Sequence, residues 1–155
     1  MSDQVVYTSK IELERIKGPL RKAKMPAEEE DVFFGVHSEI AEHYKVDPAV
    51  NNPHATTIDY VVAATGGWLT GTFGGALEAR GIDASAGKLT SSVEGDIEKE
   101  DNVLVVRRIR VRYTLQASDE HLETIERVHE MHHKYCPVYR TLYKSIDVTT
   151  SYEVI

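Results

Sequence analysis

An uncharged, glycine-rich stretch from Tyr60 to Leu77 most strongly limits how this chain can fold. It contains five glycines, and each glycine in a helix interior costs about 1 kcal/mol relative to alanine. Gly67, Gly71 and Gly75 recur every four residues. On a helix they form one flat stripe that lets another backbone approach closely. We therefore predict a closely packed helix whose stripe needs a second backbone against it.

The same stretch has almost the length of a membrane span. However, threonine and glycine lower its hydropathy, Asp59 and Glu78 flank it directly, and no second apolar segment exists. We favour a core helix and expect no membrane association. Its N-cap is predicted at Thr56 or Thr57, with Asp59 in the first turn. We expect it to run to about Arg80, with Gly81 as the residue that ends it. 

Composition limits the class of protein. A length of 155 residues suits one domain over residues 1–155. The net charge of −7 argues against nucleic acid and against anionic membranes as partners. The chain has one cysteine, so no intrachain disulfide can form, and a lone thiol fits the reducing cytoplasm. No basic segment followed by an apolar run marks a signal peptide at the N-terminus.

Strand and helix patterns alternate along the chain and predict an α+β fold with an antiparallel sheet. A polar connection is expected over residues 18–31, and a turn over residues 99–102. A second helix is expected from Ser118 as N-cap, with Leu122, Ile125, Val128 and Met131 as its apolar stripe. Strands are predicted over residues 5–16, 32–40, 88–97, 103–115 and 145–155.

Arg108, Arg110 and Arg112 lie on one face of the strand predicted over residues 103–115, and apolar side chains alternate with them. A row of arginines can indicate nucleic-acid binding. The neighbouring strand over residues 88–97 carries an acidic face, however, so we interpret the arginines as partners in cross-strand ion pairs.

Cys136 precedes Pro137, a residue suited to the first position of a helix, so Cys136 is predicted at the N-cap. Helix N–H groups there would favour the thiolate and lower the thiol pKa. The alternative is a small, buried, unreactive side chain. Zinc held by His129, His132, His133 and Cys136 is conceivable from helical spacing, but no second ligand cluster exists, and we expect no metal and no cofactor.

Two segments of the chain resemble the OsmC/Ohr family of osmotically inducible and organic hydroperoxide resistance proteins. They are CPVYRTL, from Cys136, and TTIDYVVAATGGWLTGTFGGALEARGI, from Thr56. The resemblance covers residues 53–155. It implies an OsmC-like fold, in which antiparallel sheets pack on a long central glycine-rich helix and a second helix. It also implies an intertwined homodimer whose second copy supplies the backbone opposite the glycine stripe.

The resemblance further implies thiol-dependent reduction of organic hydroperoxides, an oxidative-stress function, by a peroxidatic and a resolving cysteine. The peroxidatic position on the central helix falls at Trp68, whereas the resolving position is Cys136. The family's glutamate falls at Ile58, with Asp59 adjacent. Its arginine has no clear equivalent, since Arg15 and Arg21 are the only candidates before the helix and neither lies in a convincing motif.

Three functional hypotheses follow. The first is an OsmC-like protein without peroxidase activity that binds a small apolar ligand or a partner at the dimer cleft, in a pocket at Trp68, Ile58 and Asp59. The second is an enzyme in which Cys136 is peroxidatic and a low-molecular-weight thiol resolves it. The third is a structural role. An enzyme needs Cys136 exposed, and a binder needs a cavity beside Trp68.

Overall fold

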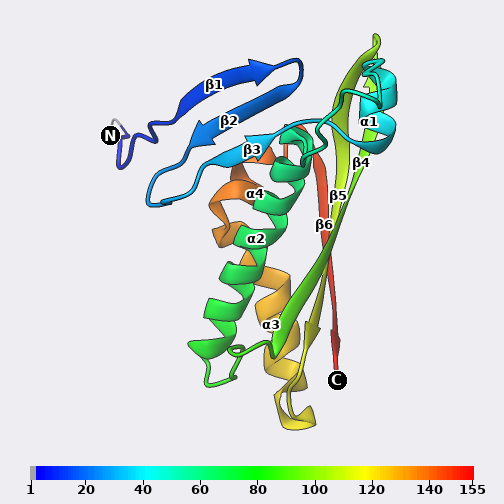
Figure 1. The fold of residues 1–155 in the computed structure, drawn as a ribbon. Coiled ribbons are helices and arrows are strands. Elements are labelled where there is room, and N and C mark those ends of the chain that lie inside the picture. Colours follow the sequence, from blue (N-terminus) through cyan, green and yellow to red (C-terminus); the bar gives the residue numbers. More distant parts are fainter. Residues whose placement is uncertain (1–2) are drawn as a thin grey trace. The chain divides into compact units, whose positions relative to one another are not determined.

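The computed structural model describes residues 3–155 (Figure 1). The chain divides into two compact units, unit 1 up to Tyr60 and unit 2 from Val61 to Ile155. The long helix α2, Thr57–Glu78, begins in unit 1 and continues in unit 2. Each unit is described by itself below.

Unit 1 contains a three-stranded antiparallel sheet in the order β1–β2–β3, followed by the short helix α1. The predicted polar connection over residues 18–31 is wrong, because β2 lies within it and forms the central strand. The three basic residues of β2 led to the prediction of an exposed connection. In the structure, the Lys22 ammonium lies 3.5 Å from Glu14 on the neighbouring strand β1 and 3.7 Å from Asp31, which precedes the other neighbouring strand, β3. The bounds are β1 Glu12–Lys17, β2 Leu20–Lys24, β3 Val32–Phe34 and α1 Ser38–His43.

Two other predictions for unit 1 also need correction. The strand expected over residues 5–16 begins only at Glu12. The strand expected over residues 32–40 is β3 followed by α1. Ser38 has a φ of +49°, so the backbone turns sharply between the strand and the helix instead of continuing extended.

A reciprocal cap starts α2 at Thr56. The Asp59 backbone N–H donates to the Thr56 hydroxyl (3.0 Å), and the Thr56 backbone N–H donates to an Asp59 carboxylate oxygen (2.8 Å). This is a capping box with aspartate in place of the usual glutamate. The prediction of a threonine N-cap with Asp59 in the first turn is confirmed.

The end of α2 is two residues earlier than predicted, at Glu78, but Gly81 has the expected role. Gly81 has a φ of +77°. Its N–H donates to the Glu78 carbonyl (3.0 Å), and the Ile82 N–H donates to the Leu77 carbonyl (3.0 Å). These two bonds form a Schellman motif, which requires a left-handed residue that glycine adopts at little cost.

Unit 2 contains a three-stranded sheet in the order β4–β5–β6. Asp101 and Asn102, with φ of +51° and +64°, make the two-residue turn between β4 and β5. The β4–β5 pair is antiparallel, whereas β6 runs parallel to β5. The sheet is therefore mixed, and the prediction of a wholly antiparallel sheet is wrong, because α3 and α4 cross over between β5 and β6. The bounds are β4 Leu89–Glu100, β5 Val103–Leu115, α3 Leu122–His132, α4 Pro137–Leu142 and β6 Asp147–Val154.

Helices α2 and α3 cover one face of this sheet (Figure 1). The core between them is apolar and close-packed. Gly66 permits part of this contact, because a Cβ there would lie 2.2 Å from Cγ2 of Val93 on β4. The buried core side chains include Leu69, Phe73 and Leu77 from α2, Ile109, Val111, Tyr113 and Leu115 from β5, and Ile125 and Val128 from α3.

The start and stripe of α3 differ from the prediction. A 3₁₀ turn, Asp119–His121, precedes the helix, and the Ser118 side chain makes no capping hydrogen bond. Leu122 and Met131 are both 44% exposed, whereas His132 is buried with Ile125 and Val128. The preceding 3₁₀ turn shifts the helix start to Leu122, and the buried face includes a histidine that an apolar pattern does not reveal.

Candidate functional site

One face of α2 is uncovered in unit 2. A Cβ placed on Gly67, Gly71 or Gly75 would meet no atom of this unit within 4 Å. The glycines that pack inside the unit are instead Gly66, against β4, and Gly74, with Leu89 3.2 Å from its Cβ position. The backbone predicted opposite the stripe is therefore not supplied by unit 2.

Trp68 lies beside that stripe, with 55% of its surface exposed. A tryptophan side chain carries a large apolar area and is usually buried on average. Exposed Tyr60 and Val61 lie two turns earlier on the same helix. The exposed face of α2 therefore carries the indole of Trp68 next to the flat backbone of the glycine stripe.

Cys136 is the N-cap of α4, as predicted. Its Sγ accepts a hydrogen bond from the Tyr139 backbone N–H (3.4 Å), and Pro137 is the first helical residue. The side chain is 0% exposed and belongs to the core cluster of unit 2. The helix cap favours a thiolate, whereas the complete burial keeps reagents away from the sulfur.

A buried polar chain lies in the core of unit 2. The Nδ1 atom of His132 is 2.7 Å from the His129 carbonyl oxygen, and Nε2 is 2.8 Å from the Tyr113 hydroxyl. Since a carbonyl only accepts, Nδ1 carries the proton in the neutral ring, and the Tyr113 hydroxyl donates to Nε2. Burial lowers the pKa of His132 to about 4 and raises that of Tyr113. Both groups are therefore neutral at pH 7.

The histidines considered as zinc ligands have other partners. His129 Nε2 lies 2.9 Å from the Thr150 hydroxyl, and its ring lies 4.7 Å from that of Tyr152. The His133 ring meets the Tyr139 ring edge-on at 5.0 Å. Among the residues that the structure describes, no three histidine, cysteine or carboxylate groups lie together in a way that could hold a metal ion.

Asp59 belongs to a polar cluster in unit 1. One carboxylate oxygen accepts from the Thr56 N–H and lies 2.7 Å from Nε2 of His37. Nδ1 of His37 is 3.1 Å from the Ser38 hydroxyl. Burial alone would raise the pKa of Asp59, but the hydrogen bonds from His37 and Thr56 outweigh it and lower that pKa. His37 and Ser38 were missed in the sequence, where no spacing connects them to Asp59.

Ile58 lines a cavity of about 360 Å³ in unit 1, together with Arg21. Trp68 and Cys136, by contrast, both belong to unit 2. The grouping of Trp68 with Ile58 and Asp59 in one pocket stays a prediction. Arg15 lies opposite Arg21 in the β1–β2 register, and only Arg21 lines this cavity.

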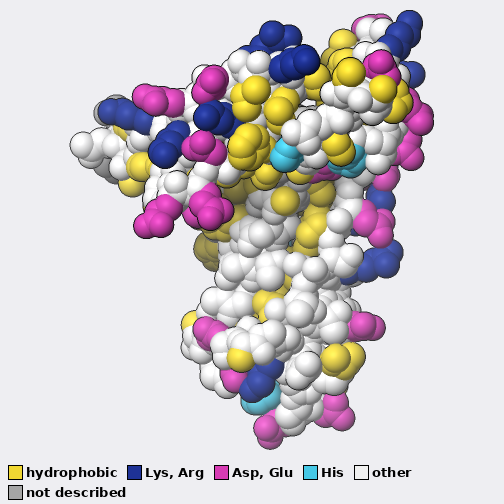
Figure 2. Space-filling model, in the orientation of Figure 1, with side chains coloured by type: hydrophobic (Ala, Val, Ile, Leu, Met, Phe, Trp, Pro, Cys, Tyr) yellow, Lys and Arg dark blue, Asp and Glu magenta, His cyan; other side chains and the backbone are white. Residues whose placement is uncertain are grey.

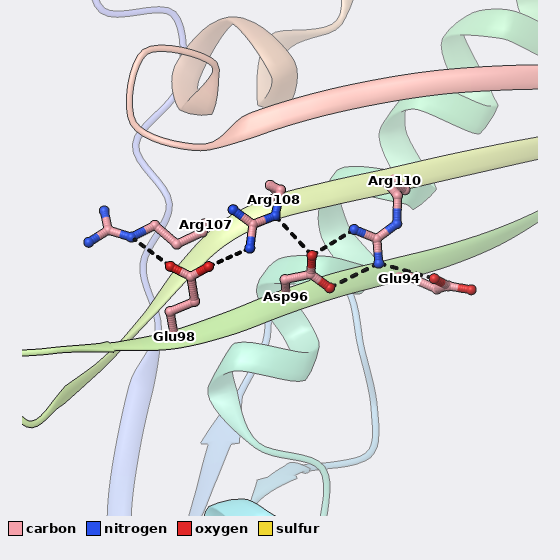
Figure 3. Close-up of polar contacts among 6 residues, drawn as sticks. All are labelled: Glu94, Asp96, Glu98, Arg107, Arg108 and Arg110. Carbon is pink, nitrogen blue, oxygen red and sulfur yellow. Dashed lines mark hydrogen bonds and ion pairs between the residues drawn. The ribbon is translucent and has the colours of Figure 1, made fainter.

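Arg108 and Arg110 of β5 make the predicted cross-strand ion pairs (Figure 3), whereas Arg112 has no carboxylate partner among the described residues. Asp96 receives bonds from Arg108 (2.9 Å) and Arg110 (2.8 Å). Glu98 pairs with Arg108 as well, and Glu94 with Arg110 at 3.1 Å. Acidic and basic side chains can be followed along the edge where β4 and β5 run (Figure 2). The charges of Arg108 and Arg110 are thus neutralised by their neighbours.

The sequence model of the OsmC-like protein family matches residues 50–151. The chain therefore belongs to the OsmC-like family. The match includes α2, Trp68 and Cys136. Within residues 3–155, no helix is both long and apolar enough to cross a membrane.

Solved structures of low sequence identity share the fold. An OsmC-like protein of unknown function from Vibrio cholerae has a TM-score of 0.71 at 12% identity, covering 97% of this chain and 100% of its own. An OsmC-like protein from Mycoplasma pneumoniae gives 0.68 at 13%, covering 97% and 99%. The organic hydroperoxide resistance protein OhrB of Bacillus subtilis gives 0.67 at 12%, covering 96% and 100%. No curated protein matches the sequence.

Proposed function

We propose that this chain is an OsmC-like protein without two-cysteine peroxidase activity, which binds a small apolar ligand or a partner at the cleft of a homodimer in the cytoplasm. The observation that carries the proposal is the single cysteine, with Trp68 on the central helix where the family's reactive sulfur is expected. The organic hydroperoxide resistance named for the Bacillus subtilis protein does not transfer at 12% identity.

Reduction of a hydroperoxide requires either two protein thiols, or one protein thiol and an external thiol that reduces it again. In the two-cysteine cycle, a thiolate attacks one peroxide oxygen, an alcohol leaves, and the sulfur becomes a sulfenic acid. A second thiol then displaces water and forms a disulfide. Trp68 has no nucleophilic sulfur, so Cys136 alone cannot complete this cycle within one chain.

The homodimer is supported by the uncovered face of α2. The stripe of Gly67, Gly71 and Gly75 has nothing against it in unit 2, and Trp68 beside it is more than half exposed. A second copy of α2 would cover both. The free energy gained by close packing of the two helices would then offset the loss of helix propensity at the glycines.

Sedimentation tests the dimer. We expect a dimer at micromolar concentration and weaker association in Gly71→Leu, because a side chain on the stripe prevents close approach. Glu123→Gln, an exposed change on α3 and outside the stripe, serves as the control and should leave association unchanged. A stable monomer at these concentrations would contradict the proposal.

The alternative is a one-cysteine peroxidase, in which Cys136 attacks the peroxide and a low-molecular-weight thiol reduces the sulfenic acid. The hydrogen bond from the Tyr139 N–H to Sγ favours it, since a helix N-cap stabilises a thiolate. The complete burial of Cys136 opposes it. Hydroperoxide consumption with dithiothreitol distinguishes the two: we expect wild type and Cys136→Ser to have the same background rate.

The variant Trp68→Cys tests, in the same hydroperoxide assay, whether position 68 is the peroxidatic position. If Trp68 occupies the peroxidatic position, the new sulfur should restore turnover and form a disulfide with Cys136 on oxidation. Such a bond requires Cα atoms about 4.4–6.8 Å apart. A well-folded Trp68→Cys protein with neither activity nor disulfide would contradict the assignment of position 68, and turnover that depends on Cys136 in wild type would favour the alternative.

A further inference from the structure

The cavity of unit 1 is a preformed depression of about 360 Å³, within the range of about 300–1,000 Å³ typical of small-molecule sites. All its lining residues lie between Pro19 and Ile58. The site therefore requires neither Trp68 nor Cys136, and Ile58 is the one residue that it shares with the pocket predicted from the sequence.

Hydrogen bonds fix the wall of this cavity. The Gly35 N–H donates to the Ala55 carbonyl (3.0 Å), and the Asn51 side-chain amide donates to the Val36 carbonyl (3.2 Å). A Cβ on Gly35 would lie 3.1 Å from the backbone nitrogen of His54, so only glycine allows this approach without a shift. The residues after β3 are thereby held against the segment that leads into α2.

The lining combines an apolar wall with one charge. Among the described residues that line it, Arg21 has the sole ionised side chain. Four aliphatic side chains and one aromatic ring supply most of the rest, from Val36, Ile40, Val46, Ile58 and Tyr44.

The Arg21 guanidinium has no carboxylate partner among residues 3–155. One of its nitrogens donates to the Pro19 carbonyl, and its carbon lies 5.9 Å from the Phe34 ring centroid. A guanidinium has five N–H donors, so several remain for a ligand. By contrast, the neighbouring Lys22 on β2 is paired with Glu14 and Asp31.

We propose that this cavity binds a small monocarboxylate with an apolar body, its carboxylate on Arg21 and its hydrocarbon against Val36, Ile40, Val46 and Ile58. Arginine matches a planar carboxylate with two parallel hydrogen bonds. The aliphatic wall excludes a second charge from the other end of the ligand, because an unpaired charge there would be desolvated. Dicarboxylates and sugars are therefore poor candidates.

Titration calorimetry with hexanoate tests the site on the full chain. We expect saturable binding that is at least about tenfold tighter than that of hexan-1-ol, hexylammonium or acetate, since each lacks either the anion or the apolar body. Amide shifts in an NMR titration should localise to residues 19–58. Equal affinity for hexanoate and hexan-1-ol, or for hexanoate and acetate, would overturn the proposal.

Matched variants separate this site from its surroundings. Arg21→Gln should weaken hexanoate binding about tenfold or more, whereas Arg15→Gln, opposite it on β1 and outside the cavity lining, should not. Tyr44→Ala, at a side chain 57% exposed, should weaken hexanoate without changing acetate. If Arg21→Gln binds hexanoate with the same affinity as Arg15→Gln and the wild type, the proposal is wrong. This outcome does not depend on whether the protein is a dimer.

Discussion

The His132 ring accepts a hydrogen bond from the Tyr113 hydroxyl across 2.8 Å in the core of unit 2. Both side chains are buried, and the other ring nitrogen donates to the His129 carbonyl. In a protonated His132 both ring nitrogens are donors, so Nε2 would donate to the Tyr113 oxygen and the buried Tyr113 O–H would lose its acceptor. This pair therefore links the stability of the core to the protonation of a single histidine.

Stability should fall in mildly acidic solution. The pKa of His132 is about 4 in the folded chain, against 6.5 ordinarily, because burial disfavours the cation. Between these values the unfolded chain binds the proton more tightly, so stability is complete above about pH 6.5 and declines towards pH 4. From pH 7 to 5 the expected loss of unfolding free energy is about 2 kcal/mol, measured by urea denaturation.

A variant tests the assignment of that pH dependence. Burial also lowers the pKa of His129 and of His133, and these contribute in the same direction. His132→Gln should therefore flatten the pH profile without abolishing it. A His132→Gln protein with the full wild-type slope would show that the other histidines carry the effect.

Gly66 and Gly67 should respond oppositely to alanine. At Gly66 a Cβ lies 2.2 Å from Val93 Cγ2, so Gly66→Ala overpacks the core and should cost about 1–3 kcal/mol, independently of protein concentration. Gly67→Ala meets nothing in unit 2 and gains helix propensity. Any loss of stability there should appear only in association, as a concentration-dependent change. Equal stability losses at the two positions would contradict this packing.

The ion-pair ladder should contribute modestly and depend on salt. Hydrogen bonds from Arg110 and Arg108 hold the pKa of Asp96 well below its usual range, but these side chains are all at least one-third exposed, so solvent and salt screen their charges. Asp96→Asn should lower the melting temperature slightly in dilute buffer, and the difference should shrink in 1 M NaCl as screening increases. Arg112→Gln, opposite Ser92 in the register, is the control and should show no such salt dependence.

The sequence predicted those elements whose pattern is local. The strand Val103–Leu115 was predicted with its exact bounds, because the alternation from Arg108 to Leu115 and an acidic neighbouring strand indicate its faces. The N-cap of α2, the glycine that ends it and the N-cap position of Cys136 followed from single-residue preferences.

Other features depend on partners distant in sequence. The basic strand β2 has acidic side chains beside it in space, which its own five residues do not indicate. The parallel pairing of β5 with β6 depends on how the chain crosses between them. The burial of His132 depends on Tyr113 from a different element. The cavity at Arg21 combines residues from β2, α1 and the start of α2, so no local motif could indicate it.

Cys136 should react slowly with thiol reagents in the native protein. Its sulfur is 0% exposed, so modification requires local opening of the segment around α4. Labelling by Ellman's reagent should be at least about tenfold slower in buffer than in urea. If native Cys136 reacts as fast as the unfolded chain, the sulfur is accessible in solution, and the one-cysteine alternative gains support.

Trp68 provides the most direct test of the dimer, because it is the only tryptophan and all indole emission comes from it. In a single chain its side chain is 55% exposed, so a monomer should emit at long wavelength and be freely quenched by iodide. If a second α2 covers the stripe, emission at micromolar concentration should be blue-shifted and protected from iodide. Gly71→Leu should reverse both effects by weakening association.

Dilution of the wild-type protein is the matched control for that variant, since it separates the subunits without changing the sequence. Emission should then move to longer wavelength with the same midpoint that sedimentation gives for dissociation. A shift caused by an added apolar ligand at constant dimer fraction would support binding beside Trp68. Long-wavelength, freely quenched emission from a protein that sedimentation shows to be dimeric would place Trp68 outside the interface and remove it from the proposed cleft.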